Sequence, residues 1–269
     1  EISECLVGSE MCIRDSNYIS YAGILGLTAR KGQTPTIPGV QIADIGGGAL
    51  YAAIGILIAL MGVKQNGVGQ YVDTSMLDGA VSWLPVLAND YFVKGVSPKA
   101  AENILNGQNA CYEVYETADG RYISIGAIEP HLWANFCDAI GKEEFKLWQR
   151  DLTKQDEMFA CLREMFKSKT QAEWIEKLTG VDCCWAPVKN LEEVFADPQV
   201  LARDMVYEMT DPAGCYGSVK MIGSAVKLSE TPARQELFPP RKGEHNAEYL
   251  KAVGYSDEQI AEFEKNGII

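Results

Sequence analysis

The sequence predicts an α/β fold made of a larger and a smaller part, and three observations lead to this prediction. Residues 41–89 read as a helix, a turn, a strand and a second helix, the alternation that builds layered α/β domains. Residues 112–126 read as a β-hairpin, and several amphipathic helices follow it. Between these stretches, residues 94–110 are rich in glycine, asparagine and other polar residues, which is typical of a linker.

Composition limits the classes of function. The chain has 269 residues and 47% hydrophobic content, enough for one large or two medium domains. A net charge of −13 argues against nucleic acid as a partner, because binding phosphates along a strand needs a basic face. It does not exclude an anionic small molecule held in a local basic pocket. The eight cysteines show no CxxC pair and no metal-ligand spacing, so we expect no metal site and a reduced, cytoplasmic compartment.

The first sixteen residues are interpreted as a non-native leader. They have no helical or strand period, and they lack the basic start and apolar core of a signal peptide. Residues 5–16 resemble the in-frame translation of a sequencing adapter. We therefore expect native protein to begin near Asn17 and to lack its upstream part.

The first native segment leads to a lone carboxylate. Residues 17–28 are small and apolar and predict a helix or a strand-to-helix piece, and a loop follows over residues 29–38. Asp44 then lies between a short apolar run and three consecutive glycines, which allow backbone to come close to another segment or a ligand. The uncharged apolar stretch behind them, to residue 61 or 63, predicts a helix buried nearly all round. Its helical part is short for a bilayer span, so no membrane span is expected.

Two readings of Asp44 follow from its place just ahead of that predicted helix. Free N–H groups and the positive end of the helix dipole favour an anion there, so Asp44 can be a helix cap. It can equally be a catalytic carboxylate held at a glycine-lined opening. The residues alone leave both readings open.

The remaining elements are predicted from local patterns. Asp119 and Gly120 form a two-residue hairpin signal, and Glu129-Pro130 reads as the start of a helix. Residues 170–173 read as a capping box. The other predictions are a turn at 64–69, strands or extended segments at 70–75, 182–187 and 214–228, and helices at 76–89, 157–167, 170–179, 191–196, 246–251 and 257–264.

Five sequence segments stand out by their order and spacing: NYIS at 17–20, ADIGGG at 43–48, GVGQYVD at 67–73, YETADGRY at 115–122 and GAIEP at 126–130. Together they resemble the family III CoA-transferases, also called the CaiB/BaiF family. Within that family the α-methylacyl-CoA racemase branch is most similar. Each segment is weak alone, and the resemblance covers essentially everything after residue 16.

The resemblance implies a Rossmann-like large domain, a smaller α+β domain and a C-terminal return to the large domain. The corresponding ranges are a leader at 1–16, the remainder of the large domain at 17–93, the linker at 94–110, the small domain at 111–205 and the return at 206–269. It also implies an interlocked homodimer and an upstream part of roughly a hundred residues, about half of such a nucleotide-binding domain. The implied partner is an acyl-CoA substrate, with coenzyme A as part of the substrate and no separate cofactor.

The resemblance also implies residue roles. Asp44 matches the catalytic aspartate, and Glu129 matches a glutamate that pairs with the racemase histidine. That histidine is expected at position 14, where Arg14 stands; a guanidinium stays protonated, so we expect the chain as written to be inactive. The predicted substrate-binding residues are Asn17, Tyr18, Gly46, Gly47 and Gly48, with backbone N–H groups of the glycines facing a developing enolate.

Three functions remain open. The first is epimerisation of a 2-methylacyl-CoA thioester by two-base proton transfer, favoured by Asn17-Tyr18 and by residues 126–130. The second is CoA transfer through an aspartyl anhydride on Asp44. Val40-Gln41 favours this second function, because racemases tend to carry an asparagine four residues before the aspartate and this chain does not. The third is a non-catalytic CoA-binding or dimerisation fragment. His131 and His245 are expected to be structural or surface residues rather than bases.

Overall fold

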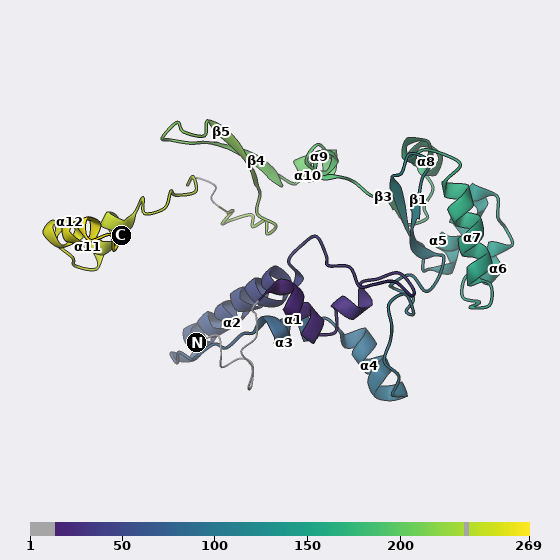
Figure 1. Ribbon diagram of the computed structural model, residues 1–269, viewed down its shortest axis with the longest axis horizontal. Helices are drawn as coiled ribbons and strands as arrows, with labels where there is room; N and C mark the ends of the chain where they lie inside the picture. The colour runs from purple at the N-terminus through teal and green to yellow at the C-terminus, as the bar shows by residue number, and fades with distance from the viewer. Residues whose placement is uncertain (1–13, 234–236) are drawn as a thin grey trace. The chain divides into compact units, whose positions relative to one another are not determined.

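The computed structural model of the chain describes residues 14–233 and 237–269. Residues 1–13 of the predicted leader lie outside the described residues, whereas Arg14 is the N-cap of the first helix and residues 15–16 belong to it. The described residues form two compact units, one ending at Val188 and the other beginning at Lys189 (Figure 1). The first unit contains two separate hydrophobic clusters.

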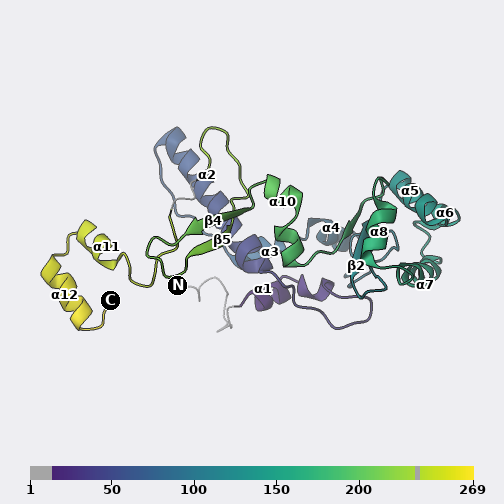
Figure 2. The same cartoon turned by 90° about the horizontal axis from the view of Figure 1, so that it is seen from above.

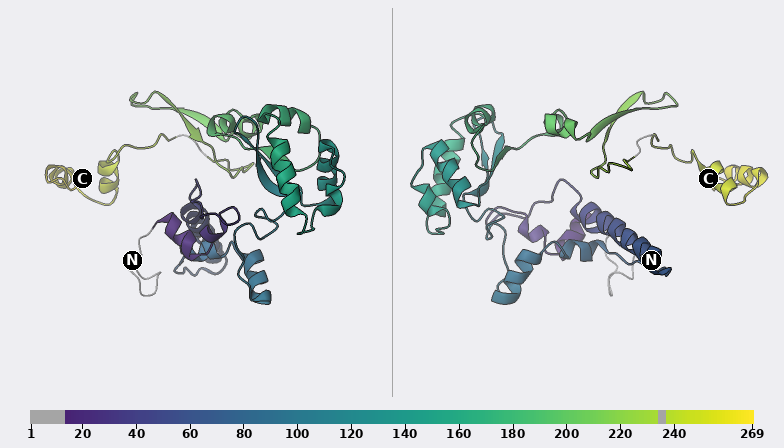
Figure 3. Two further views of the ribbon diagram at one scale, coloured as in Figure 1. Left: turned by 45° about the vertical axis from the view of Figure 1, so that its right-hand side comes forward. Right: turned by 180° about the vertical axis from the view of Figure 1, so that it is seen from behind.

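The first cluster lies in a stretch of the chain, residues 15–94, whose regular elements are all helical. Its elements are α1 (Asp15–Tyr21), a 3₁₀ turn η2 (Leu25–Leu27), a π-helix η3 (Ile42–Ala49), α2 (Leu50–Asn66), α3 (Met76–Val81) and α4 (Pro85–Lys94). Tyr18 and Ile19 of α1 and Ala43 of η3 form its buried centre. Helices α1 and α3 both contact η3, so they lie beside the start of α2 (Figure 3).

Helix α2 is not buried, so the prediction of a helix enclosed nearly all round is wrong for the described residues. None of its residues is buried, and Ile56, Leu57 and Ile58 are 53%, 60% and 60% exposed. The described residues contact α2 chiefly at its start, through η3, and near Gly55, where Val72 and Thr74 lie. The apolar sequence of α2 predicts that the helix is covered by apolar groups, but it does not show which residues cover it.

Within the described part of the chain, one helical segment, Ile42–Asn66, is long and apolar enough to cross a membrane by length and composition. Core helices of water-soluble proteins have the same properties, so this is weak evidence for a span.

Two predictions in the following segment are also wrong. Residues 70–75 alternate as a strand does, but the structure has no strand there, because no partner strand lies beside them among the described residues. The predicted helix over residues 76–89 is two helices. Pro85 starts α4 as its first residue, a position that needs no N–H donor, and the preceding helix ends at Val81.

The second cluster is built on a three-stranded antiparallel sheet. The predicted hairpin is confirmed as β1 (Tyr112–Glu116) and β2 (Tyr122–Gly126), with Tyr112 opposite Gly126. Gly120 has a φ of +73°, which the turn requires and glycine adopts without strain. Strand β3 (Trp185–Pro187) pairs with the other edge of β2 and is shorter than the predicted segment 182–187.

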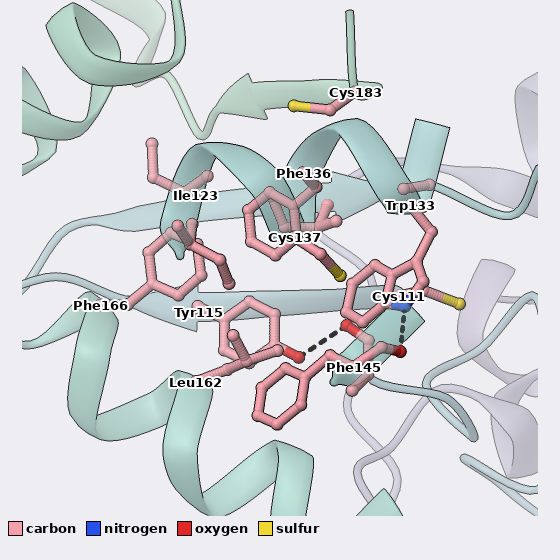
Figure 4. Close-up of a cluster of buried hydrophobic side chains, with 14 of the residues drawn as sticks. Cys111, Tyr115, Ile123, Trp133, Phe136, Cys137, Phe145, Leu162, Phe166 and Cys183 are labelled. Carbon is pink, nitrogen blue, oxygen red and sulfur yellow. Dashed lines mark hydrogen bonds between the residues drawn. The ribbon is translucent and has the colours of Figure 1, made fainter. Parts of the chain in front are cut away.

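Four helices follow the hairpin: α5 (Pro130–Ile140), α6 (Phe145–Trp148), α7 (Gln155–Phe166) and α8 (Gln171–Leu178). They gather beside the sheet (Figure 2) and share one core with it. In that core Tyr115 stacks on Phe166, and Trp133 donates a 2.7 Å hydrogen bond to the backbone oxygen of Phe145 (Figure 4). The capping box predicted at Thr170 is confirmed.

The second unit holds α9 (Leu191–Phe195), α10 (Pro198–Ala202), β4 (Val206–Thr210), β5 (Ser218–Ile222), α11 (Asn246–Ala252) and α12 (Asp257–Lys265). Strands β4 and β5 form a two-stranded antiparallel ribbon. The helices predicted at 191–196, 246–251 and 257–264 are confirmed, whereas β4 and α10 were not predicted. The mixed α/β class is therefore confirmed. Both sheets in the described residues are antiparallel, so those residues hold no parallel pair of a Rossmann-like sheet.

Candidate active site

Asp44 lies inside a helix rather than ahead of one. It is the third residue of η3, a π-helix that continues directly into α2. π-Helical turns are rare and often mark functional positions. The reading of Asp44 as a helix cap is wrong, because Gln41 occupies the N-cap position and makes no side-chain cap bond. The Asp44 side chain is exposed and has no hydrogen-bond or ion-pair partner among the described residues.

The glycines after Asp44 allow close packing of η3 against α3. A Cβ added to Gly47 would lie 2.8 Å from the backbone oxygen of Met76, and one added to Gly79 would overlap the carbonyl oxygen of Gly47. A Cβ on Gly46 would overlap the ring of Trp83. The glycine run thus fixes the turn that carries Asp44 against its neighbour. Whether Gly46, Gly47 and Gly48 also donate to a substrate stays a prediction.

Asp15 holds the same turn from the other side. Its Oδ2 atom accepts hydrogen bonds from the backbone N–H groups of Ala43, at 2.7 Å, and of Asp44, at 3.0 Å. The first N–H groups of a helix have no partner within the helix, so a carboxylate placed there satisfies them. Sequence reasoning missed this role. Asp15 lies in the adapter-like stretch of residues 5–16, to which sequence analysis assigned no function.

The other predicted residues near Asp44 belong to α1. Arg14 is the N-cap residue of α1, and its backbone oxygen accepts from the N–H groups of Asn17 and Tyr18, at 3.0 and 3.2 Å. Asn17 is exposed, whereas Tyr18 is 7% exposed and belongs to the buried cluster. Because Asp15 bonds to the Asp44 amide, position 14 lies one residue from a direct contact with the Asp44 backbone.

Glu129 lies in the second cluster, as the exposed N-cap residue of α5. Its backbone oxygen accepts from Trp133, and the predicted helix start at Pro130 is confirmed. The side chain of Gln149 donates to the backbone oxygens of the two residues before Glu129, Ala127 at 3.0 Å and Ile128 at 2.9 Å. Gln149 is 6% exposed, and no sequence signal identified it.

A buried polar network supports Gln149 in turn. Its backbone oxygen accepts from the side chains of Asn109, at 3.1 Å, and Gln155, at 3.3 Å. The side-chain oxygen of Gln155 also accepts from the backbone N–H of Ala110, which lies two residues before β1. The backbone segment just before Glu129 is therefore held by a network of three amide side chains, those of Asn109, Gln149 and Gln155, in addition to apolar packing.

The structure brings Asp15, Asp44 and position 14 together, but it does not join them to Glu129. No hydrogen bond or ion pair among residues 14–233 and 237–269 links the two predicted carboxylates. The described residues contain no group of three His, Cys, Asp or Glu side chains that could hold a metal ion. Burial raises the pKa of the Cys137 thiol to about 12, so that buried cysteine stays protonated and serves packing.

Comparison with known proteins gives one coherent result. The sequence model of CoA-transferase family III matches residues 10–246, beginning inside the stretch interpreted as a leader. An acyl-CoA transferase of Fusarium pseudograminearum is 33% identical, over 92% of this chain and 55% of that protein. The α-methylacyl-CoA racemase of Mus musculus is 32% identical, over 97% of this chain and 68% of the relative.

A solved structure agrees with these sequence matches. The crystal structure of a CaiB/BaiF family protein from Brucella suis superimposes with a TM-score of 0.74 at 26% identity, covering 91% of this chain and 64% of that one. The chain thus spans between about half and two thirds of the length of the relatives it matches.

Proposed function

The chain belongs to CoA-transferase family III, and from this premise we propose that it carries the chemistry of an α-methylacyl-CoA racemase. The substrate would be a 2-methylacyl-CoA thioester, epimerised at its α-carbon. Members of the family are racemases or CoA-transferases, so an acyl-CoA substrate is common to both. Assembly as a homodimer, which the resemblance implies, belongs to the same proposal.

One observation carries the proposal. Position 14, where the resemblance places the second base, adjoins Asp15, whose carboxylate is bonded to the Asp44 amide at 3.0 Å. Two acid/base positions 30 residues apart in sequence therefore lie on neighbouring turns of one cluster. Racemisation needs such a pair, because the proton leaves one face of the α-carbon and returns to the other.

The proposed reaction has two steps. One base takes the α-proton, and the electron pair of the broken C–H bond moves toward the thioester oxygen to give an enolate. The opposite group, now acting as an acid, delivers a proton to the other face, and the electron pair returns to form the new C–H bond. Asp44 is one of the two groups. Its carboxylate is exposed and unpartnered among the described residues, so it is available for proton transfer.

Arg14 cannot be the other group. A guanidinium stays protonated in proteins, so it cannot accept the α-proton. We therefore expect the chain as written not to invert a 2-methylacyl-CoA, and Arg14→His to supply the missing base.

A second candidate is CoA transfer, favoured by the same exposed carboxylate and by the acyl-CoA transferase among the relatives. Here Asp44 attacks the thioester carbonyl and forms an aspartyl anhydride, and the C–S bond breaks to release the CoA thiolate. The CoA thiolate then attacks the Asp44 carbonyl of the anhydride, which releases the donor carboxylate and leaves an Asp44–CoA thioester. The acceptor carboxylate attacks that thioester, which forms a new anhydride and frees the CoA thiolate. The thiolate finally attacks the acceptor's carbonyl to give the product acyl-CoA and the free Asp44 carboxylate. This route needs no second base at position 14. A third candidate is a fragment that binds CoA or a second chain without catalysis.

The test compares the chain as written, Arg14→His, and Arg14→His combined with Asp44→Asn. Each is incubated with one enantiomer of a 2-methylacyl-CoA in D₂O, and α-deuterium and inversion are measured by mass spectrometry and chiral chromatography. The proposal expects inversion with deuterium uptake only for Arg14→His. Inversion by the chain as written would refute the two-base assignment. If CoA instead passes to an added carboxylate without deuterium uptake, and Asp44→Asn abolishes that transfer, CoA transfer would replace racemisation as the function.

A further inference from the structure

The proposed function uses the Asp15–Asp44 contact only to locate position 14 and assigns Asp15 itself no role. The Asp15 Oδ2 accepts from two consecutive N–H groups, those of Ala43 and Asp44, across 28 and 29 residues of sequence. Hydrogen bonds to an ionised carboxylate are shorter and stronger than those between neutral groups. Two such bonds from one oxygen fix the backbone of the residue that carries the proposed catalytic side chain.

The turn that carries Asp44 is therefore held on two sides. On one side the N–H groups of Ala43 and Asp44 bond to Asp15. On the other side Gly47 lies against the backbone of α3, where no Cβ would fit. With both ends fixed, the direction in which the Asp44 side chain leaves η3 depends on Asp15.

We propose that Asp15 is a positioning residue, which holds the Asp44 backbone so that the Asp44 carboxylate faces the α-carbon of the bound acyl-CoA. This inference rests on the proposed function and goes beyond it by assigning a role to a residue outside the acid/base pair. We assign Asp15 no part in the proton transfer, and its Oδ2 is bonded to the two N–H groups. It acts only through Asp44.

Ser75 offers a matched control. Its side chain caps the neighbouring helix α3 by accepting from the backbone N–H of Asp78 at 3.0 Å. Helix α3 packs on η3, so Ser75→Ala removes a cap in the same cluster without touching the Asp44 turn. A general loosening of the cluster would affect both variants, whereas a positioning role would separate them.

The first measurement is amide hydrogen exchange, resolved by residue, on the 269-residue chain. Asp15→Ala should speed exchange at Ala43 and Asp44 at least about tenfold, because both N–H groups lose a charged acceptor. Asp15→Asn keeps an acceptor oxygen and should change exchange only about two- to threefold. Ser75→Ala should speed exchange at Asp78 and leave Ala43 and Asp44 unchanged. Unaltered exchange at those two amides in Asp15→Ala would overturn the proposal.

The second measurement is the rate of α-deuterium uptake in the Arg14→His background. Asp15→Ala should lower kcat about tenfold or more with KM within about twofold, and Asp15→Asn should recover most of the loss, because orientation rather than binding is affected. Faster amide exchange with unchanged kcat would reduce Asp15 to a structural cap and overturn the positioning role. An inactive Arg14→His chain would refute the proposed function, and with it the catalytic consequence, even where the amide result shows that the contact exists.

Discussion

Gln149 bonds to the backbone segment just before Glu129, and replacing it tests whether these bonds hold that segment in place. Its amide nitrogen donates to the backbone oxygens of Ala127 and Ile128, at 3.0 and 2.9 Å, and the residue is 6% exposed. Gln149→Leu keeps much of the volume and removes both donors. The two carbonyl groups then lie in a largely buried place without these partners.

The magnitude follows from the two bonds. A buried hydrogen bond contributes about 1 kcal/mol net, and a buried acceptor left without a partner costs about 1–3 kcal/mol. We therefore expect Gln149→Leu to lower the free energy of unfolding by about 2–4 kcal/mol. The loss should concentrate at residues 126–130, because those carbonyls lie immediately before Glu129.

Gln171 provides the matched control for this prediction. It is 3% exposed, and its side-chain amide donates to the backbone oxygens of Tyr122 and Val188, so the chemistry is the same as for Gln149. Those carbonyls belong to the sheet region, away from the segment before Glu129. Gln171→Leu should therefore destabilise the same core without selectively loosening residues 126–130.

Urea unfolding followed by tryptophan fluorescence measures the first effect, and amide hydrogen exchange measures the second. Gln149→Leu should speed exchange at residues 126–130 well beyond the increase caused by Gln171→Leu. A change in unfolding free energy below about 0.5 kcal/mol would match an ordinary surface substitution and refute the reasoning. Equal exchange at residues 126–130 in the two variants would show that Gln149 stabilises the core without positioning Glu129.

The other predictions concern packing and cysteines. Gly79→Ala should lower the free energy of unfolding by about 1–3 kcal/mol, because its Cβ would overlap the carbonyl oxygen of Gly47. Gly62→Ala, with no atom near its added Cβ, should raise it by about 0.5–1 kcal/mol in the same urea assay. Iodoacetamide at pH 8 should label exposed Cys184 and spare buried Cys183 in peptide maps, and equal labelling would contradict the burial. Burial raises the pKa of Cys183 from 9.0 to about 11, so its stabilising contribution is present below pH 9 and is lost as pH rises through about 11. Cys183→Ala should show a smaller fall in urea midpoint over that range.

Local signals in the sequence predicted the second cluster well. The Asp119-Gly120 pair determines a turn within a few residues, and Gly120 indeed adopts a positive φ. The side chain of Thr170 caps its helix by accepting from the backbone N–H of Glu173, three residues later. Pro130 favours the first position of a helix because its ring fixes φ and it has no N–H to satisfy. Each of these elements is determined by residues adjacent in sequence, so sequence reasoning could find it.

The first cluster was predicted less well because its structure depends on distant residues. Residues 70–75 have the alternation of a strand, but a strand also needs a partner, and none of the described residues provides it. The apolar run behind Asp44 was assigned correctly as a helix, but its burial was not, since burial depends on what surrounds it. Residues 42–49 are π-helical and contact α1 and α3, and no pattern in the sequence predicted that form.

The candidate site shows the same division between residues that have a local signature and residues that act at a distance. Asp44 and Glu129 could be singled out because each lies in a recognisable motif. Asp15 and Gln149 could not be assigned their contacts, because each bonds across about 20 to 30 residues to a backbone that the motif does not specify. Yet both bond to the backbone beside a predicted carboxylate, and neither needs to meet the substrate to do so. If orientation of the two carboxylates controls the chemistry, variants of Asp15 and Gln149 should lower turnover while leaving the proposed acid/base side chains in place.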